Sequence, residues 1–152
     1  MLAHEFLKTE HEVLLFIDSD IEFTAEDVAK LWNLYIKDHD QDVSNIYMGA
    51  YRRKGETVTW VWKGGVERPL TDFTEPTEID YAGTGFMMIP RKVFEALDDP
   101  DWERRDGIRA YFQDDGLDLS EDYFFCQEAR KVGFKILCDP SIKLKHWGRK
   151  GY

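Results

Sequence analysis

The sequence predicts a single α/β domain in which a mixed β-sheet is flanked by helices. Three observations support this class. The length of 152 residues suits one domain with a substantial core. Short apolar runs typical of strands alternate along the chain with segments of helical periodicity. A hydrophobic content of 43% is typical of a globular chain and argues against disorder.

The N-terminal half contains the strongest strand and the clearest helix. Residues 13–17 are five consecutive apolar residues, too few for a typical helix, and they predict a strand buried on both faces. Thr24 is a suitable N-cap for an amphipathic helix over 25–37, because acidic residues follow it in the first turn. The other elements expected here are a helix end over 2–8, a strand over 46–51, an alternating strand over 57–62 and its hairpin partner from Val66.

Glycine, proline and serine mark the element boundaries of the second half. Pro90 suits the first turn of a helix, Ser120 is a suitable N-cap, and Gly133 a C-terminal stop. The expected elements are strands over 79–82 and 86–89, a helix over 91–97, a long loop over 98–118, a helix over 121–132, and strands over 134–138 and 142–146.

Charge and cysteine content exclude several classes of function. The net charge of −10 argues against a nucleic-acid-binding surface and against an anionic membrane surface. Cys126 and Cys138 lie in a predicted helix and a predicted strand, so we expect buried thiols in a reducing compartment. The sequence has no signal-peptide pattern, and no apolar run approaches the ~20 residues that span a bilayer. We therefore expect a cytoplasmic protein.

Two carboxylates follow the strand over 13–17 directly. Asp18 and Asp20 project to the same side if the chain stays extended, at the strand end where open α/β sheets place their ligands. Such an oxygen-rich edge suits Mg²⁺ or Mn²⁺ together with a phosphorylated ligand. Asp-x-Asp pairs also occur elsewhere in this aspartate-rich chain, so a solvated turn is an equally good explanation of the pair alone.

Three further features have both a structural and a functional interpretation. Trp60 and Trp62 share one strand face, which favours packing but could also form a platform for a sugar or base ring. Glu121 and Asp122 begin a predicted helix, where acidic residues ordinarily complement the helix dipole. His146 lies near the C-terminus, where a lone histidine is more often a surface residue than a ligand.

The order of these motifs is more specific than any one of them. Asp18-Ser19-Asp20 is followed by Ala82-Gly83-Thr84-Gly85-Phe86, then by Leu119-Ser120-Glu121-Asp122-Tyr123, Asp139-Pro140 and His146-Trp147-Gly148. This succession resembles glycosyltransferases of the GT-A fold, especially family-2-like members, over nearly the whole chain. The resemblance implies transfer of a sugar from a nucleotide-diphosphate donor to a carbohydrate or other acceptor hydroxyl.

The resemblance also implies roles for individual residues. Asp20, with Asp18 and His146, would hold Mn²⁺ or Mg²⁺ beside the diphosphate. Asp122 would be the general base of an inverting displacement, with Glu121 as an alternate or helper, and the helix N-terminus would keep Asp122 ionised.

Donor or acceptor contacts are expected from a glycine-containing loop and from the C-terminus. The resemblance places Gly83, Thr84 and Gly85 beside the donor sugar, where glycine permits close backbone approach. Trp147 and Arg149 are further binding candidates, and Arg149, with Lys150, is suggested by charge alone.

One departure from the family leaves alternatives open. Most of the N-terminal nucleotide-binding half that such enzymes place before the Asp-x-Asp strand is expected to be missing, so a strand edge would be open to self-association or to a partner chain. The chain could therefore be a catalytic half or a non-catalytic subunit that binds a partner. A metal-dependent phosphohydrolase is a third alternative, although the sequence shows no additional His/Asp cluster for a two-metal centre.

Overall fold

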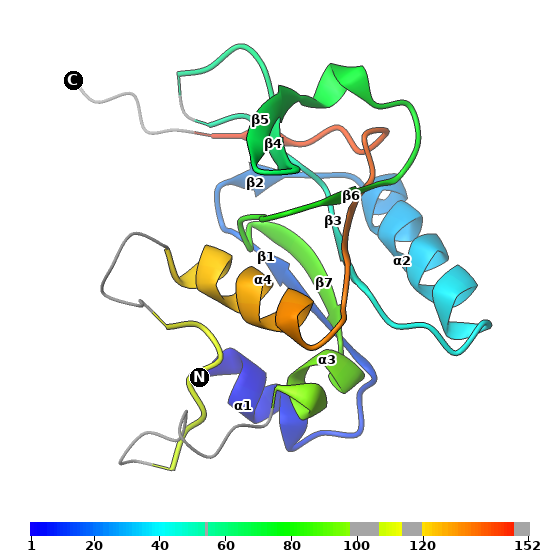
Figure 1. Cartoon of the computed structure of the whole chain (residues 1–152), viewed down its shortest axis with the longest axis vertical. Helices are drawn as coiled ribbons and strands as arrows, with labels where there is room; N and C mark the ends of the chain where they lie inside the picture. The colour runs from blue at the N-terminus through cyan, green and yellow to red at the C-terminus, as the bar shows by residue number, and fades with distance from the viewer. Residues whose placement is uncertain (54, 98–106, 114–119, 148–152) are drawn as a thin grey trace.

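A five-stranded mixed sheet lies at the centre of the computed structural model, which describes residues 1–53, 55–97, 107–113 and 120–147 (Figure 1). The strand order is β1-β7-β3-β8-β6, with β3 and β8 parallel and the other neighbours antiparallel. This confirms the predicted α/β class with a mixed sheet. The strands are β1 (Val13–Ile17), β3 (Ile46–Met48), β6 (Thr77–Ile79), β7 (Phe86–Pro90) and β8 (Ile136–Cys138).

Helices cover both faces of this sheet, because the side chains of its strands alternate between two apolar clusters. In β7, Phe86 and Met88 pack in the cluster that contains residues of α2, whereas Met87 and Ile89 pack in the cluster that contains residues of α1, α3 and α4. Figure 1 shows α2 on its own beside the sheet, apart from the other three helices. The helices are α1 (Leu2–Leu7), α2 (Ala25–His39), α3 (Arg91–Ala96) and α4 (Glu121–Lys131).

Two small antiparallel pairs complete the described structure. The strands β4 and β5 form a hairpin whose two-residue turn is Gly64-Gly65, with φ of 64° and 78°. Positive φ at both turn positions favours glycine and confirms the predicted hairpin. The second pair joins a strand just after Asp20 to one near the C-terminus. The elements are β2 (Ile21–Glu22), β4 (Trp60–Lys63), β5 (Val66–Pro69), the 3₁₀ helix η1 (Leu70–Asp72) and β9 (Lys145–His146).

Several strand predictions need correction. The strand expected over 79–82 lies at Thr77–Ile79, and the one expected over 57–62 begins at Trp60. β1 is not buried on both faces: its residues are partly exposed, and Ile17 is 37% exposed. The reason is its position, since β1 is an edge strand paired on one side with β7. The strand expected over 46–51 ends at Met48, and of the strand expected over 142–146 only Lys145 and His146 pair. The expected loop over 98–118 lies largely outside the described residues.

The two cysteines are buried and unpaired, as predicted. Burial raises the pKa of both thiols, Cys126 and Cys138, to about 12, so neither is a thiolate near neutral pH. Among the described helices, none combines the length and the apolar character needed to cross a bilayer.

Candidate functional site

The pairing of β2 with β9 brings the C-terminal histidine to the first acidic motif. Ile21 pairs with His146, and the Trp147 N–H donates to the Asp20 carbonyl at 2.8 Å. As a result the His146 Nε2 lies 3.4 Å from Asp20 Oδ2, with both side chains partly exposed. Two of the three predicted metal ligands, 126 positions apart in the numbering, are therefore neighbours.

The hydrogen bond at Nδ1 of His146 determines whether Nε2 can act as a ligand. Nδ1 lies 3.0 Å from the carbonyl oxygen of Arg52, and because a carbonyl only accepts, Nδ1 must carry the hydrogen. In the neutral ring, Nε2 then presents a lone pair to the Asp20 carboxylate. A proton or a cation between these two acceptors would stabilise the contact. A backbone carbonyl that orients a histidine through its second nitrogen is also the usual support of a metal-ligating imidazole.

The chain does not stay extended after β1, because the Ile21 N–H donates to the Asp18 carbonyl at 3.1 Å and closes a turn at Asp18. The Asp18 N–H donates to the Gly85 carbonyl at 3.0 Å, and a Cβ added at Gly85 would lie 2.9 Å from Asp18 Oδ2. No group of three His, Cys, Asp or Glu side chains within the described ranges is close enough to hold a metal ion. Asp20 and His146 fit a cation that takes its remaining ligands from phosphate and water, as Mg²⁺ commonly does, with Asp18 nearby.

Tyr51 is a central site residue that sequence reasoning missed. Its hydroxyl accepts a hydrogen bond from the Gly85 N–H at 3.3 Å, and its ring packs edge-to-face on His146 with centroids 5.1 Å apart. Burial, together with the facing charges of Asp18, Asp122 and Asp20, raises the pKa of Tyr51 to about 12. The phenol is therefore neutral. In the sequence it is simply the last apolar residue of an expected strand, which gives no signal.

Tyr51 also changes the explanation of the Gly83-Thr84-Gly85 loop. A Cβ at Gly83 would lie 2.7 Å from the Tyr51 hydroxyl oxygen, and one at Gly85 would lie 2.5 Å from it. Both distances are shorter than real Cβ contacts. A side chain at either position would therefore have to displace the Tyr51 ring, whether or not a sugar also approaches the loop.

The same loop holds Asp122 at the start of α4. The Thr84 N–H donates to Asp122 Oδ2 at 3.2 Å, and the Thr84 hydroxyl donates to Oδ1 at 3.1 Å. Burial raises the pKa of Asp122, and the charges of Glu121 and Asp18 add to the rise, although the two bonds from Thr84 oppose it. The sequence led us to expect that the helix N-terminus favours the ionised form, whereas desolvation of the carboxylate shifts its pKa in the opposite direction. Glu121, beside it, is exposed.

Comparison with known proteins places the chain in a family. The model of the glycosyl transferase family 2 matches residues 2–98, which is more than half of the chain. The chain belongs to glycosyl transferase family 2. A search of curated proteins found no match.

Solved structures support the GT-A fold of this glycosyltransferase domain. The A197 protein from STIV matches with a TM-score of 0.60 and 18% identity, over 97% of this chain and 64% of A197. GalNAc-T7 with UDP, GalNAc and Mn²⁺ matches with a TM-score of 0.60 and 17% identity, over 96% of this chain and 30% of GalNAc-T7. The domain thus spans less than two thirds of either protein.

The predicted C-terminal contacts of the glycosyltransferase domain are only partly described. Trp147 is 61% exposed, and its indole N–H donates to Glu22 Oε2 at 2.8 Å, so it is held on the surface beside β2. Arg149 and Lys150 lie outside the described residues.

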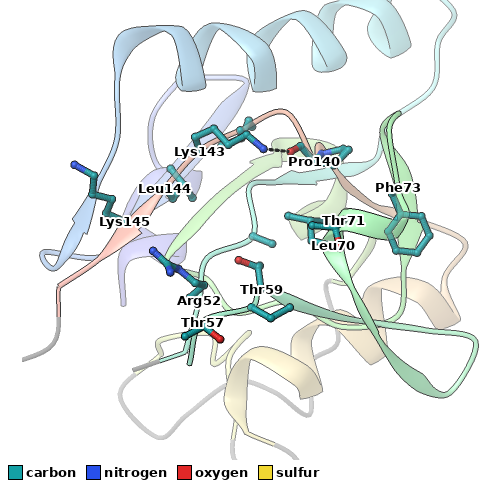
Figure 2. A pocket seen from close by; sticks show the side chains of 13 residues that line it. Arg52, Thr57, Thr59, Leu70, Thr71, Phe73, Pro140, Lys143, Leu144 and Lys145 are labelled. Atoms are coloured by element: carbon teal, nitrogen blue, oxygen red, sulfur yellow. Dashed lines mark hydrogen bonds between the residues drawn. The ribbon is translucent and has the colours of Figure 1, made fainter. Parts of the chain in front are cut away.

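A large cavity lies next to His146, on the side where two basic segments meet. It has a volume of about 500 Å³ and is lined by Arg52, Lys143 and Lys145 among apolar and threonine side chains (Figure 2). The Lys145 ammonium pairs with Glu22, and that of Lys143 donates to the Pro140 carbonyl. Among the described residues, Arg52 and Lys143 have no acidic partner within ion-pair distance. This cavity therefore has positive charge available for an anionic ligand.

A smaller cavity of about 160 Å³ lies on the other side of the same backbone segment. Because residues 51–53 alternate in direction, Arg52 lines the large cavity, whereas Tyr51 and Arg53 line the small one. The small cavity is bounded by Gly83 and by the aromatic residues Tyr51, Trp60, Trp62, Tyr81 and Tyr123.

Proposed function

We propose that this family 2 domain is a metal-dependent, inverting glycosyltransferase that uses a nucleotide-diphosphate sugar as donor. One observation carries the proposal: carboxylates from separate segments face one neutral tyrosine. Asp18 and Asp20 follow β1, Asp122 begins α4, and the negative charges of all three act on Tyr51. His146 packs on the ring of the same tyrosine. Family membership supplies the class of reaction, and this convergence supplies residues suited to it.

Asp20 and His146 are the residues that would hold Mn²⁺ or Mg²⁺, with Asp18 as a further carboxylate close by. The geometry of the His146 ring supports this, since its Nδ1 hydrogen is directed to Arg52 and its Nε2 lone pair to Asp20. A divalent cation bound there would neutralise the negative charge of the leaving nucleoside diphosphate. GalNAc-T7, of similar fold, was solved with Mn²⁺.

Asp122 is the proposed general base. As the acceptor oxygen forms its bond to the anomeric carbon, the bond from that carbon to the donor phosphate oxygen breaks, and the acceptor proton passes to Asp122. Attack from the face opposite to the leaving group inverts the configuration. The raised pKa of Asp122 makes it a stronger base than an ordinary aspartate, and the two bonds from Thr84 fix its orientation.

Thermal-shift measurements with nucleoside diphosphates and nucleotide sugars, with and without Mn²⁺, test the proposal. We expect the melting temperature to rise with at least one of these ligands only when Mn²⁺ is present, because ligand binding stabilises the folded state by mass action. Asp20→Ala should abolish this rise. Asp40→Ala removes an exposed acidic side chain at the end of α2 and should leave it unchanged. A Mn²⁺-independent rise, or the same rise in Asp20→Ala, would refute the metal site.

A second proposal concerns the edge of the sheet. We propose that the described part corresponds to the metal-binding and acceptor portion of the GT-A fold, and that β1 pairs with further β-structure, supplied by another copy or another chain. The support is that β1 is an edge strand whose apolar residues remain partly exposed. Sedimentation of the purified chain tests for self-association, and Leu15→Lys, placed within β1, should abolish it. A monomer that binds donor and transfers sugar on its own would refute pairing.

A further inference from the structure

We infer that the acceptor is a neutral carbohydrate and that one of its rings occupies the small aromatic cavity beside Gly83. This inference rests on the proposed function, since it takes Asp122 as the base. It extends that function by assigning an acceptor class and the residues that recognise it. The argument uses three properties of the cavity: its distance from the base, its aromatic lining and its charge.

Gly83 lies between the cavity and the proposed base. It forms part of the cavity wall, and a Cβ added there would lie 3.7 Å from Asp122 Oδ2 and 2.7 Å from the Tyr51 hydroxyl. A ligand against Gly83 is thus within reach of the carboxylate that must accept its proton. The volume of about 160 Å³ far exceeds the roughly 10–15 Å³ that a single water needs.

Five of the described residues that line this cavity are aromatic. Tyr81 and Tyr123 are stacked with centroids 5.1 Å apart and planes 18° apart, and Trp62 is bridged to Tyr81 through the backbone. Trp60 is 40% exposed, so much of its indole is not used in the core. The C–H bonds on one face of a pyranose are weakly positive and match the negative face of an aromatic ring, while its hydroxyls stay hydrated at the rim.

The charge of the cavity favours a neutral ligand. Among the described residues, Arg53 is the one cation that lines it, and the guanidinium is already paired with Glu56 and Glu67. The large cavity differs, because Arg52 and Lys143 there lack acidic partners among the described residues. An anionic group would therefore prefer the large cavity, and an uncharged sugar ring the aromatic one.

Saturation-transfer NMR with methyl pyranosides and disaccharides tests this inference directly, because it needs neither donor nor turnover. We expect transfer to the ring protons of at least one neutral sugar. Trp60→Ala should weaken its binding about tenfold or more, and Trp60→Phe should restore most of the affinity. Trp32→Ala is the matched control, since Trp32 is 46% exposed on α2 and should leave the spectrum unchanged.

The remaining outcomes separate this inference from the proposed function. Absence of transfer to every neutral sugar overturns the inference, as does a signal that Trp60→Ala leaves unchanged. A signal lost in Arg52→Gln but kept in Trp60→Ala places the acceptor in the large cavity and also overturns it. If no donor raises the melting temperature but a sugar signal that depends on Trp60 is present, the proposed transferase is refuted and the cavity remains a sugar-binding site. With turnover, Trp60→Ala should lower the ratio of sugar transfer to donor hydrolysis.

Discussion

Asp122→Asn separates the chemical role of the carboxylate from its structural one. Asparagine has the same shape: its carbonyl oxygen can accept from the Thr84 N–H, while its amide can donate to the Thr84 hydroxyl, which then reverses its role. The two contacts survive and only the negative charge is lost. Because asparagine cannot accept the acceptor proton, we expect kcat to fall by about 10²–10⁴-fold, the usual contribution of a general base.

The folded state of the same variant should not lose stability at neutral pH, although its activity falls. Burial raises the pKa of Asp122 above its ordinary value of 3.8, so ionisation costs more in the folded state than in the unfolded one. Wild-type stability relative to Asp122→Asn should therefore decline as the pH rises from about 3.8 through the raised pKa, and then stay level. At pH 7 the variant should be at least as stable as the wild type.

The assay measures the rate of sugar transfer and the melting temperature of the wild type and the variants from pH 4 to pH 8. Wild-type kcat/KM should fall at low pH with a midpoint above 3.8, and the variant should lose this limb. Glu121→Gln is the control, because Glu121 is exposed and adjacent but holds none of the bonds to Thr84. If Asp122→Asn kept full activity and Glu121→Gln lost it, Glu121 and not Asp122 would be the general base. A marked drop in the melting temperature of Asp122→Asn at pH 7 would refute the desolvation argument.

Three further predictions concern residues that hold the site and its helix. Tyr51→Phe leaves the Gly85 N–H without its acceptor, so we expect a loss of about 1–3 kcal/mol in unfolding free energy by urea titration; an unchanged value would show that water replaces the phenol. Thr24→Ala removes the capping box of α2 and should cost about 1 kcal/mol. Burial alone would raise the pKa of Asp27, but its bonds from Thr24 and the Lys143 N–H lower it. The cost of Asp27→Asn should therefore vanish as the pH falls below 3.8 through that lowered pKa, and a pH-independent cost would contradict this.

Sequence patterns correctly predicted the helices and strands that depend on interactions between residues close together in the chain. The apolar spacing and the cap of α2, the Gly64-Gly65 hairpin and the apolar run of β7 all follow from neighbouring residues. The burial of β1 does not, because the same five apolar residues would be enclosed in a central strand and are half-exposed in an edge strand. β2 was not predicted, since a two-residue strand has no period and pairs with a partner more than 120 residues away.

The candidate site also depends on contacts between distant residues, which the sequence does not show. Its acidic residues and His146 were predicted as candidates from motif order, and Asp20 and His146 are neighbours. The burial that raises the pKa of Asp122 was not predicted, because a helix N-terminus is visible in the sequence whereas the packing that desolvates the carboxylate is not. Tyr51 follows the same logic: it links the metal candidates to the base only through contacts made after folding.

The position of Tyr51 gives the two halves of the proposed reaction a common physical support. Its hydroxyl fixes the Gly85 N–H, Gly85 O holds the N–H of Asp18, and the adjacent Thr84 holds Asp122. A displacement of the phenol would therefore move Asp18, beside the proposed metal site, and the proposed general base together. Since in-line displacement depends on the separation of leaving group and base, one neutral side chain packed against two glycines can set that separation without taking part in the chemistry.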